Sequence, residues 1–489
     1  MRTSVLPRVS LRTAARLVAA LLLALVGLGL LAGPASAHTE LLGSDPAAGA
    51  VVPQAPDQVT LTFNEPIRVV ARAVHLFTAE GAELRSPATS VDSRVLVDLP
   101  GALAPGSYTL AWRVISADGH PVSGALVFSV GAPSSSVAPV VRASGSGAVQ
   151  VAISAVQALV YLGIFLAVGL IVFRQLLLPV EPAAEPVRSR LLTLARRGAD
   201  VGFIASLLLL PLTTINQRGD RLVDLFAARS WEIDLGNPEP TAAIMAMFGL
   251  ALAVTTSGNR RLQSVVPLAG GVLALSSLAV VGHSRSFGPQ VLVIASDVTH
   301  VLAGSVWLGG LVGVAVTLRM LGESPGLAAR TVGRFSAVAA LLLVAVGASG
   351  TVLTWRILGS FHGFVDTSFG RTLLVKLSLV AVVVVLAGVN RWRLLPALSR
   401  DGASGGRSTG ARLRRAVRIE GLLLIGVLAV TGVLVDRTPE TGAAGPSRSV
   451  ATARVDTATG TVRVRVALDP ARVGSNTITI VLTDRTGSA

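Results

Sequence analysis

Two short segments carry side chains that could bind a metal ion. The small residues at 35–37 have the pattern of a signal-peptide cleavage site, and His38 follows them directly. After cleavage, His38 would offer both its α-amino group and its imidazole to one ion. Asp118 and His120 add a carboxylate and a second imidazole. Because Cu(II) prefers tetragonal sites of nitrogen and oxygen donors, the sequence predicts one Cu(II) ion bound by His38, Asp118 and His120.

The prediction depends on removal of residues 1–37 as a signal peptide. Arginines at positions 2–16 precede an apolar run at 17–31 and a small-residue cleavage site. The alternative is an uncleaved membrane anchor, in which His38 would have no free amino group. The apolar run is shorter than the ~20 residues that a spanning helix needs, which favours cleavage.

The composition indicates a membrane protein. Of the 489 residues, 51% are hydrophobic and 14% are charged, and the mean hydropathy is +0.68, which is too apolar for an ordinary soluble chain. The net charge of +15 does not indicate nucleic-acid binding, because the arginines stand between apolar runs, as in membrane proteins. The chain has no cysteine and four methionines, which excludes thiolate sites and Met-rich Cu(I) sites.

The first part of the mature chain, residues 38–131, is predicted to be a small all-β sandwich. Its residues alternate between polar and apolar and are interrupted by turn signals. The predicted strands are Gln58–Phe63, Val69–Phe77, Arg94–Leu99, Tyr108–Ile115 and Ala125–Val130. Residues 132–147 have the composition of a linker that separates this domain from the membrane.

Residues 148–436 are predicted to form an all-α membrane domain of about eight transmembrane helices. Each apolar run is roughly long enough to cross ~30 Å of hydrocarbon: Ala148–Phe173, Ala199–Ile215, Thr241–Thr256, Leu262–Gly282, Val291–Thr317, Phe335–Trp355, Thr372–Val389 and Ile419–Val435. Arginines concentrate in the first, third, fifth and seventh connections, which places these in the cytoplasm. The even number of helices returns the C-terminus to the outside. Residues 437–489 are predicted to form a short β-rich external tail, which could be a truncated domain.

Several of these segments resemble known copper proteins. The segments His38–Leu42, Leu61–Pro66 and Trp112–Gly124 are similar to the copper-binding periplasmic protein CopC, and the segments Ser296–His300 and Val306–Leu311 resemble the membrane protein CopD. The resemblance implies a CopC–CopD fusion with a Greek-key β-sandwich. It also implies that His38, Asp118 and His120 bind Cu(II), with His38 binding through its amine and its ring. Because the first domain lacks methionine, no Cu(I) site is expected.

Ionisable residues within the membrane predict a transport path. Such residues are costly in lipid and are by default functional. Asp297 and His300 are three residues apart, so they share one face of a helix. His283 ends the preceding apolar run on the same external side. We therefore expect His283, Asp297 and His300 to form a path for copper. The alternative is that these side chains only make hydrogen bonds between helices.

The function expected from these features is copper import or resistance in the cell membrane, without enzymatic activity. The partners expected are the copper ion and the lipid bilayer, and the direction is that implied by the family resemblance. An ATP site is not expected, because the sole lysine, Lys376, follows no Gly-rich phosphate-binding loop. Two alternatives remain open: a haem protein with His283 and His300 as axial ligands, and an enzyme related to copper monooxygenases. The sequence does not predict the oligomeric state.

Overall fold

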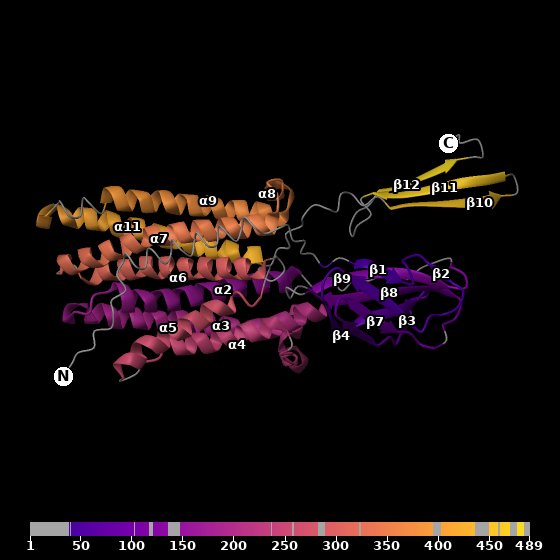
Figure 1. Ribbon diagram of the computed structural model, residues 1–489, viewed down its shortest axis with the longest axis horizontal. Coiled ribbons are helices and arrows are strands. Elements are labelled where there is room, and N and C mark those ends of the chain that lie inside the picture. Colours follow the sequence, from indigo (N-terminus) through magenta and orange to yellow (C-terminus); the bar gives the residue numbers. More distant parts are fainter. Residues whose placement is uncertain are drawn as a thin grey trace.

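The chain forms β-structure at one end of a long helical bundle (Figure 1). The computed structural model describes residues 39, 41–101, 103–116, 121–134, 147–235, 237–256, 259–281, 289–321, 324–394, 402–435, 449–457, 460–469 and 477–483. Within these ranges, side chains are not described for residues 70–72, 260–261, 325, 394, 402–411, 414 and those beyond 435. The predicted ligands His38, Asp118 and His120, and also His283, lie outside the described residues.

The N-terminal β-region consists of two sheets around one apolar core. One sheet has the order β1-β3-β7-β6 and the other β2-β9-β8-β4-β5. The first sheet contains β1 Leu41–Asp45, β3 Gln58–Phe63, β6 Ala88–Val91 and β7 Arg94–Asp98, and the second contains β2 Val51–Val52, β4 Arg68–Thr78, β5 Glu83–Leu84, β8 Gly106–Ile115 and β9 Pro121–Val130. Every second residue of β3 is buried, which is the period of a strand with one face on a core. Both sheets contribute to that core, for example Leu61 from β3 and Leu110 from β8.

Long helices make up the rest of the described chain. They are α2 Gly147–Val172, α3 Glu185–Arg218, α4 Pro238–Ala253, α5 Arg260–Ser277, α6 Gln290–Met320, α7 Pro325–Leu358, α9 Ser368–Val389 and α11 Gly402–Val435, with a short helix α8 Gly363–Asp366. Among the described residues, six helices are long and apolar enough to cross a membrane: α2, α3, α6, α7, α9 and α11. The third and fourth predicted spans correspond to α4 and α5, which are shorter apolar helices. The chain is therefore a multi-pass membrane protein with six such spans in its described part, where the sequence predicted eight.

Glycines allow α6 to pack close to its neighbours. A Cβ atom at Gly309 would overlap the backbone of Gly169 on α2, and one at Gly310 would overlap the ring of Phe335 on α7. Small residues at such positions let helix backbones approach closely in a membrane, where packing drives association. The Gly-Gly pair therefore places α6 between α2 and α7.

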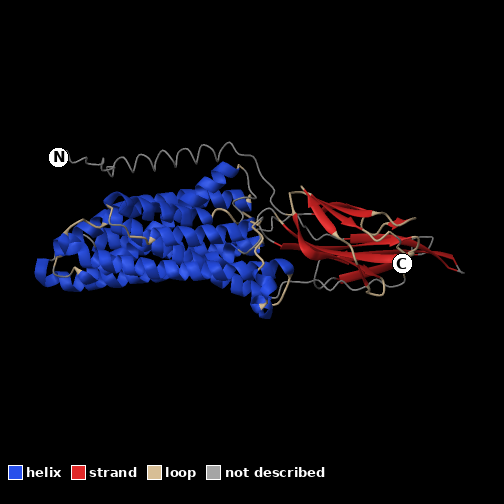
Figure 2. Ribbon diagram, turned by 90° about the horizontal axis from the view of Figure 1, so that it is seen from below, coloured by secondary structure: helices blue, strands red, loops and turns tan. Residues whose placement is uncertain are grey.

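A third sheet, near the C-terminus, lies at the same end of the helical bundle as the N-terminal β-region (Figures 1 and 2). Its three strands, β10 Ser449–Thr457, β11 Gly460–Asp469 and β12 Thr477–Thr483, pair in chain order. Both pairings are antiparallel. The two β-regions consequently share one side of the helical bundle.

Candidate functional site

The described neighbours of the predicted external ligands lie at one end of the N-terminal β-region. Thr39, which follows His38 in the chain, donates a hydrogen bond from Oγ1 to Oε1 of Glu65. Leu41, the first residue of β1, pairs with Phe63 at the end of β3. Residues 39 and 41 are thereby held against the loop that follows β3.

The strand register brings the two strand ends that flank residues 117–120 to the same end. The loop after Phe63 leads directly into β4, whose first residue, Arg68, lies opposite Ile115 at the end of β8. Ile115 in turn pairs with Pro121, the first residue of β9. Ile115 and Pro121, the strand ends on either side of residues 117–120, therefore lie at the end of the β-region where Thr39 also lies. This topology is compatible with a site shared by the two segments.

That end of the β-region contacts the helical bundle through Arg113 of β8. Its guanidinium donates from Nε to the carbonyl oxygen of Gln217 at 2.8 Å and from Nη2 to the carbonyl oxygen of Asn216 at 2.6 Å. These carbonyls are in the last turn of α3, where backbone acceptors lack helical partners and the helix dipole favours a cation. Burial lowers the pKa of Arg113, but arginine stays charged at neutral pH. The contact fixes the β8–β9 end over the end of α3.

A large cavity lies within the helical bundle. Its volume is about 590 Å³, and its lining includes Asp297 and His300 of α6 and Lys376 of α9. Asp297 is close enough to Lys376 to interact with it electrostatically, and so is His300. The structure thus brings Asp297 and His300, which the sequence placed on one helix face, to one cavity.

The orientation of His300 leaves one ring nitrogen available as a ligand. Nδ1 of His300 lies 3.2 Å from Oγ of Ser349 on α7. Ser349 gives its hydroxyl hydrogen to the carbonyl oxygen of Ala345 at 2.6 Å, so its oxygen accepts a hydrogen bond from Nδ1–H of His300. In this neutral tautomer, Nε2 carries the lone pair that a metal ion can use, and the hydroxyl acts as the orienting partner.

Lys376 is a cavity residue that our interpretation of the sequence did not include in the transport path. It lies eight residues into α9, about 12 Å along the axis at 1.5 Å per residue. His300 lies at a similar depth in α6, about 15 Å from Gln290. The sequence signal that could have identified Lys376 is its charge inside an apolar run, because an ionisable residue within the membrane is a functional candidate.

The described residues do not show a complete metal site. Within the ranges given above, no group of three or more His, Cys, Asp or Glu side chains is placed to hold one ion. Asp297 and His300 supply one carboxylate and one imidazole to the cavity. His283, the third residue of the predicted path, lies outside the described residues. The cavity can therefore offer two protein ligands from α6, and water would complete the coordination.

Comparisons with known protein families cover most of the chain. Residues 41–131 match the CopC domain, residues 148–288 match the N-terminal domain of copper resistance protein D-like proteins, and residues 329–434 match copper resistance protein D. Together these matches include both the β-region and the helical bundle.

Individual proteins are also similar to parts of this chain. The copper transport protein CutJ of Bacillus subtilis is 25% identical over 333 residues, which is 64% of this chain and 59% of the length of CutJ. Copper resistance protein C of Xanthomonas campestris pv. juglandis is 33% identical over 115 residues, which is 22% of this chain and 90% of that protein. The crystal structure of CopC from Methylosinus trichosporium OB3b is 28% identical and covers 21% of this chain and 100% of its own, with a TM-score of 0.18.

Proposed function

Because this chain belongs to the family of copper resistance proteins that join a CopC domain to a CopD membrane domain, we propose that it captures Cu(II) outside the cell membrane and moves copper inward. The observation that carries the proposal is the cavity that contains both Asp297 and His300. It supplies nitrogen and oxygen donors inside a helical bundle, where such groups are costly to maintain without a function.

Capture is assigned to His38, Asp118 and His120, which would bind one Cu(II) ion. Support comes from the convergence of Thr39 and Pro121 at one end of the β-region. The donors would be one amine, two imidazoles and one carboxylate, a set that suits Cu(II). Residues 38–131 contain neither cysteine nor methionine, so the soft ligands that favour Cu(I) are absent from this sequence segment.

The arrangement of charge supports an outward-facing β-region. Arginines gather near the C-terminal ends of α2, α6 and α9 and near the N-terminal ends of α3 and α7, for example Arg174, Arg188, Arg319, Arg330 and Arg391. These helix ends lie away from both β-regions (Figure 1). Arginines of this kind remain on the cytoplasmic side of membrane proteins. Both β-regions are therefore assigned to the outside, and copper bound there would enter the bundle between the C-terminal end of α3 and the N-terminal end of α6.

The direct test measures the copper content of cells that express the protein and of cells that lack it. Import should raise the content of washed cells at equal external copper, and the His300→Ala variant should remove the increase. A lower copper content on expression would mean export and would contradict the proposed direction. Equal contents with and without the protein would contradict transport altogether.

The external site should lose copper as the pH falls. Protons compete with copper for the amine and imidazole nitrogens, so the apparent affinity should decrease between about pH 8 and about pH 5. Titration of the purified protein with Cu(II), followed by electron paramagnetic resonance (EPR), measures this. An affinity that stays constant across the interval would contradict nitrogen ligation.

A further inference from the structure

A second, smaller cavity lies between the N-terminal β-region and the large cavity. Its volume is about 120 Å³, which is room for an ion with several water molecules. Pro121 of β9, which follows His120 in the chain, lines it together with Asn216 and Gln217 at the end of α3. These are the two residues whose carbonyl groups hold Arg113. The cavity thus begins where the β-region meets the membrane domain.

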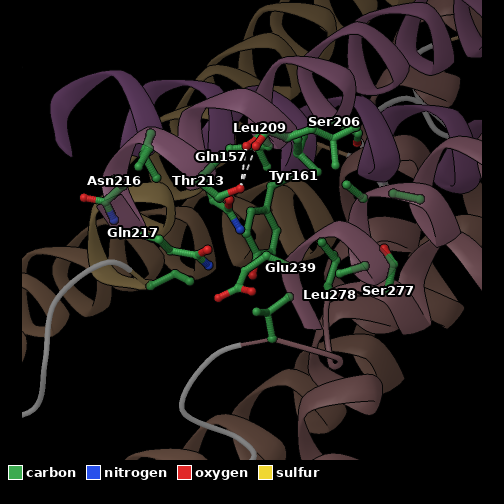
Figure 3. Close-up of a pocket in the computed structure, with 18 of the residues that line it drawn as sticks. Gln157, Tyr161, Ser206, Leu209, Thr213, Asn216, Gln217, Glu239, Ser277 and Leu278 are labelled. Carbon is green, nitrogen blue, oxygen red and sulfur yellow. Dashed lines mark hydrogen bonds between the residues drawn. The ribbon is translucent and has the colours of Figure 1, made fainter. Parts of the chain in front are cut away.

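The lining of this cavity supplies oxygen ligands and one negative charge. Glu239 comes from the first turn of α4, Gln157 from α2 and Gln217 from α3. Figure 3 shows the Glu239 carboxylate in the same hollow as these two amide groups. Carboxylate and amide oxygens bind cations, and the carboxylate gives the hollow a preference for positive charge.

Ser206 of α3 provides an independent indication of a ligand. Its side chain lines the cavity and is fully buried, and its hydroxyl has no hydrogen-bond partner within the protein. A buried hydroxyl without a partner costs free energy, so native structures normally satisfy it with protein or with ordered water. A water molecule in the cavity, free or bound to an ion, would supply that partner.

The two cavities adjoin each other. Tyr161 of α2 and Leu278 line both, and so do Val281 and Val435. Tyr161 also lies within electrostatic range of Asp297. Its ring packs edge-on against Phe165 at a centroid distance of 6.0 Å. A few side chains, including Tyr161, therefore separate the smaller cavity, here called the Glu239 cavity, from the larger cavity that contains Asp297 and His300.

We propose that the Glu239 cavity is a cation-binding vestibule that receives copper from the external domain and passes it across Tyr161 to Asp297 and His300. This inference rests on the proposed transport of copper. The vestibule offers oxygen donors, whereas the predicted external site offers nitrogen donors, so copper binds more weakly in the vestibule than outside. Weak binding suits a transit site, because conduction requires an ion to leave as readily as it enters.

The test compares Glu239→Gln with a matched control, Glu185→Gln. Both glutamates lie in the first turn of a helix and precede a proline, so both interact favourably with a helix dipole. Glu185 is exposed and lines neither cavity. Copper uptake is measured in cells against external copper concentration and divided by the amount of membrane-inserted protein. Glu239→Gln should raise the half-saturating concentration several-fold, whereas Glu185→Gln and the charge-preserving Glu239→Asp should stay close to wild type.

Binding gives a second readout. The purified full-length protein is loaded with excess Cu(II) and examined by EPR. The wild type should show a nitrogen-ligated signal and a weaker, oxygen-ligated signal, and Glu239→Gln should lose only the oxygen-ligated one.

The outcomes separate this inference from the proposed function. If the wild type transports no copper, the proposed function fails. A second outcome is that the wild type transports copper and His300→Ala does not, while Glu239→Gln takes up copper like the wild type and retains the oxygen-ligated signal. In that case the vestibule proposal is wrong and the transport proposal stands. Equal losses in Glu239→Gln and Glu185→Gln would assign Glu239 to helix stability and overturn the vestibule.

Discussion

Alanine at His300 or at Asp297 should abolish copper uptake per inserted molecule while leaving Cu(II) binding by the external domain unchanged. Both side chains line the cavity of about 590 Å³ in the bundle, and Nδ1 of His300 is held by Ser349 so that Nε2 is available. Loss of either residue removes one of the two ligands that α6 offers. The external site depends on other residues, so capture and translocation should separate.

The measurement is the initial rate of copper uptake, divided by the amount of membrane-inserted protein, together with Cu(II) binding by the purified chain. His362→Ala is the matched control, because this histidine is exposed at the start of α8 and does not line the cavity. If Asp297 and His300 only hold helices together, the variants should insert poorly and transport at the wild-type rate per surviving molecule. Normal uptake by the double variant would refute the relay.

Ser349→Ala should have a smaller effect of the same kind. The hydroxyl orients the ring of His300 but is not itself a ligand in this arrangement. Without it, the ring can rotate, and Nδ1 is no longer held as the protonated nitrogen. Uptake should fall several-fold. The copper concentration that gives half the maximal rate should change more than the maximal rate itself. A Ser349→Ala rate equal to wild type would assign the hydrogen bond to helix packing alone.

Much of the secondary structure follows from the sequence because its signals are local. The predicted strand Gln58–Phe63 is β3 with the same bounds, since alternation of apolar residues defines it. The run Val291–Thr317 is confirmed as α6, which extends it to Gln290–Met320. The run Ala199–Ile215 is only the apolar part of α3, which begins at Glu185. Hydropathy marks the part of a helix that suits lipid, whereas caps and prolines set where it begins.

The arrangement of the cavities could not be predicted in this way. Asp297 and His300 share a helix face, which spacing alone predicts, but Lys376 joins them from a helix that is distant in sequence. Glu239 lies just before the predicted third run, at the start of α4, and it gains its role only where α2, α3 and α4 meet. Contacts between distant helices depend on packing, for example on Gly169 against Gly309, and hydropathy carries no information about them.

The proposed external site differs from the cavities in that its first ligand, the amine of His38, would be free only after cleavage between Ala37 and His38. One residue inserted between Ala37 and His38 should weaken Cu(II) binding on the order of 100-fold or more, since the amine and the imidazole would no longer be held in one residue. The insertion changes no side chain of the mature protein. Thr39 and its hydrogen bond to Glu65 should also remain, so the fold of the β-region gives no reason for a loss.

The measurement is competition for Cu(II) against a chelator of known affinity, with the N-terminus of each preparation defined by mass spectrometry. The matched control carries the same extra residue at the C-terminus, where it should leave the affinity unchanged. A wild-type preparation that begins at His38 should also show one more nitrogen ligand in its EPR spectrum than the extended protein. Equal affinity of the two proteins would exclude the amine as a ligand, and copper would then have to be captured by side chains alone.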